Sequence, residues 1–364
     1  MSKNFLKSVI LTIGWLLMVL PLQAQHIAAG RIHSLFLDPD GNVWVWGGAS
    51  LQSATNERIP QLAMTDAKAI YANPAEALSF VIKKDGSLWG WGNNWYGQLG
   101  VMRKKDRSDS GYINTPRQIM KDVASVSGNN TIFAIKPDKS LWAWGTLWRH
   151  RGDNNKTAPL KPVKIMDNVK QVSSSSTHTL ALKTDGTLYA WGGNQCGALG
   201  IGNTTDKGKP VRVNTKALGK RKILKIAARN GESFAIAEDG SVWGWGEPNI
   251  VNPFCKDELR LTPVRIDDMD NVKDVALGQY KEIYLKNDGT VWEWTEDAQH
   301  PGAEPAWHKV LDHVREIAAG DYHFIALKND GTVWTWTWYT NEFGQLGNGT
   351  TRGSAIPIQV KFPK

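Results

Sequence analysis

The sequence predicts an all-β protein, a seven-bladed β-propeller of four-stranded antiparallel blades. A short phrase, an Asp-Gly turn followed by a Trp-x-Trp strand, returns seven times along the chain. Its aspartates are Asp40, Asp85, Asp138, Asp185, Asp239, Asp288 and Asp330, with Lys139 replacing the glycine in the third unit. Their spacing of 42 to 54 residues marks a repeat architecture, and each unit has the composition of strands. Seven β units that must bury both faces favour a closed ring.

The last repeat shows the expected order of elements within one blade. We expect an apolar strand, a Gly-x-x-His turn, a second strand, a hairpin, a third strand, a loop and a fourth strand. These segments are residues 314–319, 320–322, 323–328, 329–331, 332–336, 341–347 and 356–360. The hairpin contains Asn-Asp-Gly, whose residues adopt positive φ at little cost. Proline in the fourth strand suits an edge position.

The Trp-x-Trp pairs indicate packing between blades. Trp44 and Trp46 lie on one face of their strand, and valines lie on the other. Both faces are therefore apolar, as expected for a sheet between two neighbouring sheets. Thirteen of the eighteen tryptophans belong to such pairs. We expect four representatives to be largely buried, namely Trp89, Trp91, Trp243 and Trp245.

The ends of the predicted domain suggest how the ring closes. The first strand begins at Ile27, soon after the start of the chain, and the last strand ends at Val360. In the phase of the repeat, the last strand precedes the first. Pairing of these two strands would hide an exposed edge, so we expect the ring to close in that way.

Strand alternation divides the loops between two faces of the ring. The Gly-x-x-His turns and the loops after the Trp-x-Trp strands share one face, because strand direction reverses at every turn. The Asp-Gly hairpins and the links between blades share the other face. The first face carries the variable residues, so binding residues are expected there.

The amino terminus predicts export. Residues 1–24 combine a short basic head, an apolar run of about a dozen residues and a small residue near the end, which is typical of a secretory signal peptide. We therefore expect a single propeller over residues 25–364 that is secreted, periplasmic or on the cell surface. The mature chain contains no further apolar run of membrane-spanning length. A monomer is expected.

Two cysteines, Cys196 and Cys255, leave two alternatives open. An exported chain can pair them as a disulfide. However, Cys196 occupies the loop position that Tyr96 and Phe343 hold in other repeats, which suggests a buried apolar site. Two separate thiols are therefore favoured over the disulfide.

The repeat also resembles a known family. The seventh unit reads Ala-Ala-Gly-x-x-His at residues 318–323, Asp-Gly-x-Val-Trp-x-Trp at 330–336 and Asn-x-x-Gly-Gln-Leu-Gly at 341–347. The second unit repeats the Gly-Gln-Leu-Gly loop at 97–100, and the fourth has Gly-Ala-Leu-Gly at 197–200. This pattern is similar to the regulator of chromosome condensation repeat family, and it implies a seven-bladed propeller. Units three, five and six lack the loop.

The resemblance implies two kinds of function. The eukaryotic founder of that family is a nuclear, chromatin-bound exchange factor for a small GTPase. The family also includes secreted bacterial propellers, among them an inhibitory protein that grips a β-lactamase with loops on one face. The signal peptide favours the exported, bacterial type, and a guanine-nucleotide-exchange-type regulator is the alternative.

The sequence contains no recognisable catalytic constellation. It lacks HExxH, GxSxG, paired Cys-x-x-Cys and a phosphate-binding Gly-rich loop that opens a helix. His33, His178 and His323 occupy equivalent positions in three units, and equivalent positions in a ring are spread apart. We interpret them as residues that satisfy the turns. No metal, cofactor or nucleic acid is expected, and an enzyme with its site at the ring axis is the competing hypothesis.

Two sets of residues are candidates for binding a partner. Aromatic residues outside the Trp-x-Trp pairs follow third strands or lie in the turns, and they suit a protein partner in preference to a glycan. They are Trp95, Trp148, Trp338, Tyr339, Tyr280 and Tyr322. A basic stretch is the alternative, because it suits an anionic surface such as an envelope polymer. Its candidates are Lys207, Lys209, Arg212, Lys220, Arg221 and Lys222.

Overall fold

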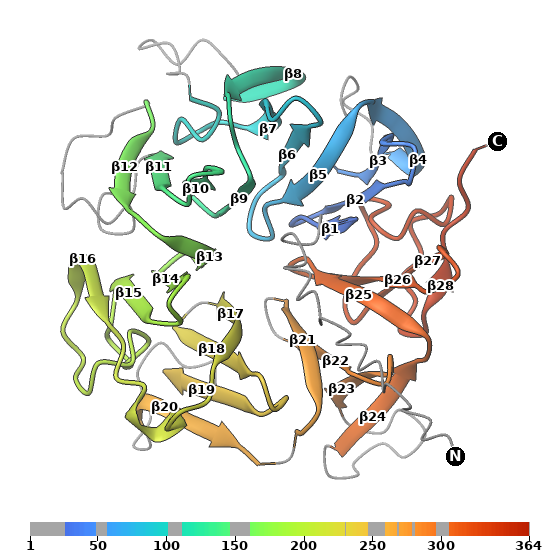
Figure 1. Cartoon of the computed structure of the whole chain (residues 1–364). Coiled ribbons are helices and arrows are strands. Elements are labelled where there is room, and N and C mark those ends of the chain that lie inside the picture. Colours follow the sequence, from blue (N-terminus) through green and yellow to red (C-terminus); the bar gives the residue numbers. More distant parts are fainter. Residues whose placement is uncertain are drawn as a thin grey trace, which may run out of the picture.

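A computed structural model describes nine segments of the chain. They are residues 26–48, 57–100, 111–145, 161–229, 231–246, 259–267, 269–278, 281–295 and 306–363. These segments form seven four-stranded sheets around one axis (Figure 1). All strand pairs within the sheets are antiparallel, so the predicted seven-bladed propeller is confirmed. The one helix in the described segments is the short 3₁₀ turn η1 (Lys216–Leu218).

The first four blades follow the chain in order. Blade one contains β1 (Ile27–Ala29), β2 (His33–Leu37), β3 (Val43–Gly47) and β4 (Glu57–Met64). Blade two contains β5 (Ala67–Ala72), β6 (Leu78–Lys83), β7 (Leu88–Asn93) and β8 (Tyr112–Met120). Blade three contains β9 (Ser125–Gly128), β10 (Thr131–Ile135), β11 (Leu141–Gly145) and β12 (Val163–Met166). Blade four contains β13 (Val169–Ser174), β14 (His178–Lys183), β15 (Leu188–Gly192) and β16 (Lys207–Arg212).

The last three blades repeat the arrangement. Blade five contains β17 (Ile223–Arg229), β18 (Glu232–Ala237), β19 (Val242–Gly246) and β20 (Arg260–Ile266). Blade six contains β21 (Val272–Leu277), β22 (Glu282–Lys286), β23 (Val291–Thr295) and β24 (Ala306–Leu311). Blade seven contains β25 (Val314–Ala319), β26 (His323–Lys328), β27 (Val333–Thr337) and β28 (Ile358–Gln359). The first strand of every blade, called the inner strand below, lies nearest the ring axis (Figure 1).

In blades two, three, five, six and seven the hairpin holds the first tryptophan of the pair by a short relay, whereas Trp44 of blade one donates directly to Asp38 at 3.0 Å. The Asp85 carboxylate accepts hydrogen bonds from the N–H and Oγ of Ser87 at 2.8 and 2.5 Å. Ser87 Oγ in turn accepts the Trp89 indole N–H at 2.9 Å, and Lys83 Nζ lies 5.4 Å from the centre of that ring. Trp89 is therefore only half-buried, which corrects the expectation that it is buried between blades.

The second tryptophan of each pair has the predicted role. Trp91 and Trp245 are buried between blades, as expected, and so is Trp243 from the first position of its pair. The Trp245 indole N–H donates to the Ala198 carbonyl of blade four at 2.9 Å, and that of Trp46 to the Gln345 carbonyl of blade seven at the same distance. The Gly-Gln-Leu-Gly loop of one blade thus receives the tryptophan of the next.

Glycine is required where this loop meets the indole. Gly347 has a φ of +65°, and a Cβ there would lie 2.8 Å from Trp46 Nε1. Trp294 of blade six is the exception among the second tryptophans. It is 44% exposed, and its ring lies 5.2 Å from that of Trp307. Blade five, which precedes it, lacks the Gly-Gln-Leu-Gly loop.

The ring closes by packing rather than by the predicted pairing of terminal strands. β1 is the inner edge strand of blade one and β28 the fourth, outer edge strand of blade seven, and the two belong to different sheets and do not pair. Ile27 and Trp46 instead pack with Val360 of the carboxyl-terminal segment in one buried cluster. The Glu316 carboxylate accepts the backbone N–H of His26 at 2.8 Å. Packed apolar side chains and the Glu316 carboxylate therefore help to join blade seven to blade one.

The division of the loops between two faces agrees with the structure. In successive blades, the first residue of an inner strand donates its N–H to the hairpin of the preceding blade. Ala67 reaches Gly41 at 2.9 Å, and Val272 reaches Gly240 at 3.0 Å. The hairpins and the links between blades therefore lie together on what we call the hairpin face. The opposite face, formed by the Gly-x-x-His turns and the loops after the third strands, is called the turn face.

Two further predictions concern the cysteines and the membrane. Cys196 is disulfide-bonded, so the expectation of two separate thiols was wrong. Cys255 is the chain's only other cysteine, and it lies outside the described residues. No helix within the described segments is long and apolar enough to cross a membrane.

Candidate functional site

The turns of the turn face are built around buried histidines. The N–H of Gly30 donates to the His33 carbonyl at 2.8 Å, and that of Gly320 to the His323 carbonyl at 2.9 Å. The histidine ring folds back onto the glycine, because a Cβ at Gly30 would lie 2.0 Å from His33 Cε1. A side chain at that position would displace the ring, which explains the Gly-x-x-His spacing.

Each histidine bridges to a serine of the next blade. The Nε2 atoms of His33, His178 and His323 lie 2.9, 2.7 and 2.8 Å from serine hydroxyls. The partners, in the same order, are Ser79, Ser233 and Ser34. Burial lowers the pKa of His33 and of His323 to about 3, so both rings are neutral at ordinary pH. These histidines satisfy turns, as predicted, and they also join blades, which the sequence reasoning missed. The missed signal is the serine that follows the histidine position in the receiving blade.

Between blades five and six an ionic link replaces the histidine bridge. Glu232 stands at the histidine position and Glu282 at the serine position. Arg229 lies between them, with Nη2 2.6 Å from Glu232 Oε2 and Nη1 2.9 Å from Glu282 Oε2. Burial raises the pKa of Glu232 to about 7, against the opposing effect of Arg229. Because the triad occupies the place of a bridge between blades, we assign it a structural role.

A second polar cluster joins the turns of blades seven, one and two. Arg31 Nε lies 3.4 Å from Asp321 Oδ2, and the Arg31 N–H donates to the Asn73 carbonyl at 3.2 Å. Burial raises the pKa of Asp321 to about 7, although the charge of Arg31 opposes the shift. Asn93 donates to Glu76 at 2.7 Å, and burial also raises the pKa of Glu76. These turns thus form one connected surface.

Three of the predicted aromatic residues lie on this surface. Trp95 is 53% exposed, and its backbone N–H donates to the Asn93 side-chain oxygen at 2.9 Å. Tyr339 is 76% exposed, and its ring centre lies 5.5 Å from that of the half-buried Tyr322. Both loops are fixed by local contacts, so the rings are held in position on the turn face.

The other three predicted aromatic residues are placed differently. Trp338 is half-buried and packs 4.4 Å from the ring of Phe324, and a Cβ on Gly278 of blade six would lie 2.5 Å from its ring. It therefore packs between blades and is left out of the candidate surface. Trp148 and Tyr280 lie outside the described residues.

The basic stretch does not form one patch. In the pairing of β15 with β16, Lys207 lies opposite Gly192 and Arg212 lies opposite Tyr189. These two cations therefore lie toward opposite ends of the outer strand β16. Lys209 is exposed on the same strand. The remaining three, Lys220, Arg221 and Lys222, lie in the link to blade five and are exposed.

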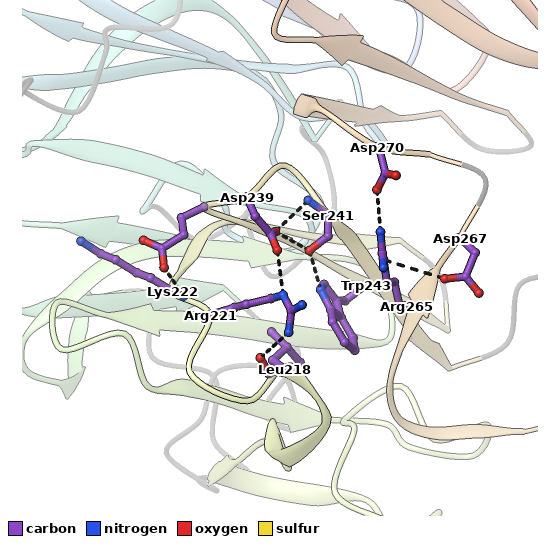
Figure 2. A network of polar contacts seen from close by, with 10 residues as sticks. Leu218, Arg221, Lys222, Asp239, Ser241, Trp243, Arg265, Asp267 and Asp270 are labelled. Atoms are coloured by element: carbon purple, nitrogen blue, oxygen red, sulfur yellow. Dashed lines mark hydrogen bonds and ion pairs between the residues drawn. The ribbon is translucent and has the colours of Figure 1, made fainter.

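Part of this charge is neutralised on the hairpin face (Figure 2). Arg221 Nε lies 2.7 Å from Asp239 Oδ2, and its guanidinium lies 5.8 Å from the centre of the Trp243 ring. The hydrogen bonds from Ser241 and Arg221 lower the pKa of Asp239, so this carboxyl is ionised. Arg221 is therefore committed to its own hairpin. Among the described residues, no group of three or more His, Cys, Asp or Glu side chains is placed to hold a metal ion.

Comparison with known proteins gives the family. Regulator of chromosome condensation (RCC1) repeats match residues 85–133 and 185–236, and a second repeat type of the same description matches 169–198 and 314–345. The RCC1 domain-containing protein RUG3, mitochondrial, of Arabidopsis thaliana is 29% identical over 270 residues, which are 68% of this chain and 60% of that protein. The ultraviolet-B receptor UVR8 of the same plant is 29% identical over 247 residues, 62% of this chain and 55% of that protein. This chain thus spans less than two thirds of either relative.

Solved structures show the same fold. Human WBSCR16 superposes with a TM-score of 0.73 at 20% identity, covering 88% of this chain and 94% of that one. Yeast RCC1 (Prp20), bound to Kap60, gives a TM-score of 0.71 at 19% identity and covers 99% and 90%. The matched residues include the hairpins of blades two, four and seven and the turns of blades three, four and seven. The chain contains regulator of chromosome condensation (RCC1) repeats and has the seven-bladed propeller fold of the solved structures.

Proposed function

We propose that this chain is an exported, non-enzymatic scaffold that binds a protein partner, in preference to a glycan, through the turn face. The observation that carries the proposal is the exposure of Trp95 and Tyr339, at 53% and 76%, on fixed loops of that face. Large aromatic residues held in place lose little conformational freedom on binding, and they are enriched among the residues that dominate protein interfaces. The surface comprises Trp95, Tyr322, Tyr339 and the Arg31–Asp321 pair.

The polar cluster supports a protein partner. Arg31 is about half-exposed and lies in the turn of blade one, between the aromatic residues of blades seven and two. A rim of charged groups around aromatic anchors is the usual composition of a protein interface. A solved structure of the yeast relative Prp20p concerns its binding to Gsp1p and histones, so one propeller of this fold is described as a protein binder. That partner choice belongs to the yeast protein.

Capture of a partner tests the turn face directly. The mature chain, residues 25–364, is used as bait against the secreted and envelope fractions of the native cells. We expect Trp95→Ala or Tyr339→Ala to lower the affinity for the captured partner by about 2 kcal/mol or more, because each removes an aromatic anchor. Lys84→Ala, an exposed change on the hairpin face, is the control and should leave affinity unchanged. Equal losses for all three variants would contradict the assignment of the face.

Export is a separate part of the proposal, supported by the sequence of residues 1–24, which lie outside the described residues. The full chain is expressed in its native host, and the mass of the protein is measured in the medium, the periplasm and the cytoplasm. We expect a species that begins close to Gln25 outside the cytoplasm. A cytoplasmic protein that keeps residues 1–24 would contradict export and favour the exchange-factor alternative.

A further inference from the structure

The inner strands share an irregularity that places charge beside the ring axis. In five blades the register of the inner strand shifts between its first and third residues. A bulge of this kind leaves the intervening residue outside the ladder of paired residues. That residue is Lys68 in blade two, Lys170 in blade four, Leu224 in blade five, Lys273 in blade six and Arg315 in blade seven. Four of the five are cations.

These residues occupy equivalent places at the hairpin face. The residue before the bulge donates its N–H to the hairpin of the preceding blade, as Val169 does to Lys139 and Val314 to Gly289, both at 2.9 Å. Inner strands surround the axis (Figure 1), so the bulge residues stand around one end of it. Three of the cations, Lys68, Lys273 and Arg315, are exposed, and Lys170 is partly exposed.

The carboxylates nearest these cations make contacts of their own. Glu238, beside Lys222, accepts the Lys222 backbone N–H at 3.3 Å. Asp274, which follows Lys273, forms an ion pair with Lys225 of blade five. Glu316, which follows Arg315, accepts the backbone N–H groups of His26 and Ile27 at 2.8 and 3.2 Å. Lys170, Lys273 and Arg315 form no ion pair with any residue in the described segments.

The cations stand on inner strands that contact one another in neighbouring blades. Lys273 Nζ donates to the backbone carbonyl of Arg315 at 3.1 Å, so the Lys273 side chain of blade six reaches the inner strand of blade seven. The Gln171 side chain, next to Lys170, forms hydrogen bonds with the backbone of Ile226 at 3.1 Å, so the inner strands β13 and β17 lie side by side. Lys170 and Lys222 therefore stand at the same end of two neighbouring inner strands. Desolvation lowers the pKa of Lys170, and the charge of Lys222 lowers it further. Lys222 extends away from the Asp239–Arg221 pair in Figure 2. We call Lys170, Lys222, Lys273 and Arg315 the axial basic arc.

The remaining bulge cation stands apart from this arc. Lys68 lies two residues after the exposed Asp66, and Asp122 holds the equivalent link position in blade three. The corresponding positions in blades four and six are Asn168 and Asn271, which carry no charge. The positive charge beside the axis is therefore concentrated in blades four to seven.

Further from the axis the hairpins carry charges of both signs, because a lysine lies 4.6 to 5.8 Å from the first aromatic ring of blades four, six and seven. The hairpins join the second and third strands of each blade, so their aspartates lie outside the inner strands. The threonine two residues further along the chain donates hydrogen bonds to each of Asp185, Asp288 and Asp330, and these bonds lower the pKa of the three carboxyls. The carboxyls are therefore ionised. All three residues are exposed. A broad acidic surface or a nucleic-acid duplex laid across this face would meet these aspartates. A compact ligand at the axis would avoid them.

We propose that the axial basic arc binds a compact polyanion whose charges lie close together, of the chemical class of the oligophosphates. The site is independent of the turn face, since it lies on the opposite face of the ring. Cations around one end of the axis, three of which form no ion pair in the described segments, raise the local concentration of such an anion and stabilise it once bound.

Calorimetric titration with tripolyphosphate at low ionic strength tests the site. Lys170→Ala and Lys273→Ala should each weaken binding by about two- to five-fold, the loss expected for one exposed charge pair, and the double variant should weaken it further. Added salt should reduce the affinity of the parent protein more than that of the double variant, because fewer charges remain to be screened.

A matched control removes an equal charge elsewhere. Lys209→Ala acts on the exposed outer strand β16 and should leave tripolyphosphate affinity unchanged. Thermal melts that match the parent show that each variant is folded. Absence of binding at low salt, or an equal loss in Lys209→Ala, would overturn the proposal. Tighter binding of a long polyglutamate that depends equally on Lys209 and Lys273 would also overturn it, in favour of an extended acidic polymer.

Discussion

The histidine bridges are the residue-scale feature on which the ring depends. His323 of blade seven and Ser34 of blade one lie 289 positions apart in the sequence, yet their side chains meet at 2.8 Å in a buried site. Ser34 also donates to the Gln345 carbonyl at 3.0 Å. One serine therefore connects a turn and a loop of blade seven to the second strand of blade one.

Removing this serine should destabilise the ring. In Ser34→Ala the buried His323 Nε2 loses its partner, and an unsatisfied buried polar group costs about 1–3 kcal/mol. We expect a loss of that size in the free energy of unfolding, measured by urea denaturation. Thr204→Ala, which removes an exposed hydroxyl, is the control. Equal stability of Ser34→Ala and the parent would show that the bridge contributes nothing.

At the scale of the element, the third strand uses its two tryptophans differently. The first lies at the hairpin end of the strand, where in five of the seven blades a serine or threonine accepts its indole N–H and a basic side chain stacks on its ring. The second, except Trp294 of blade six, is buried between two blades, and its depth follows from the position of the neighbouring blade. Trp89 and Trp91 illustrate the difference within one strand, β7, because the first is half-buried and the second fully buried.

The two tryptophans should therefore differ in their contribution to stability. Trp91→Ala empties a site between blades and should cost about 3–5 kcal/mol, as large-to-small changes in a core do. Trp89→Ala removes less buried surface and should cost clearly less. Chemical denaturation of both variants gives the comparison. A loss for Trp89→Ala as large as that for Trp91→Ala would contradict the assignment of the two roles.

At the scale of the whole molecule, buried titratable groups around the ring act in opposite directions. The pKa values of His33 and His323 are near 3, below their ordinary value of 6.5. The unfolded chain therefore binds more protons, and the stability that these groups contribute above pH 6.5 is lost as the pH falls toward 3. The pKa values of Glu232 and Asp321 are raised to about 7. Their contribution is present below their ordinary pKa values and is lost as the pH rises through 7.

Comparing variants separates these contributions. His323→Gln should be less stable than the parent at pH 7, and the difference should shrink by about 2 kcal/mol between pH 6.5 and 5, because the parent alone loses the neutral-histidine contribution. For Glu232→Gln the parent should lose stability relative to the variant as the pH rises from 5 to 8. Unfolding free energies measured at several pH values test both signs. A difference independent of pH would show that the group has the same pKa in the folded and unfolded chain.

The sequence by itself determined the architecture of this protein. Seven Asp-Gly hairpins followed by Trp-x-Trp strands are local patterns, and turn chemistry and strand alternation act over a few residues. The number of blades, the order of strands and the division of the loops between two faces could therefore be derived without coordinates. The exposed aromatic residues Trp95 and Tyr339 were also found in this way, because they stand outside the pattern that packs the blades.

Only the tertiary structure decided what each residue contacts across the ring. The serine partners of the histidines, the triad centred on Arg229 and the carboxylate of Glu316 that meets the first strand all depend on neighbours in another blade. Ring closure without terminal strand pairing and the packing of Trp338 against blade six have the same origin. So does the axial basic arc, whose members lie far apart in the sequence. Such contacts follow from how the blades dock, and docking depends on side-chain shape at each interface rather than on any local period.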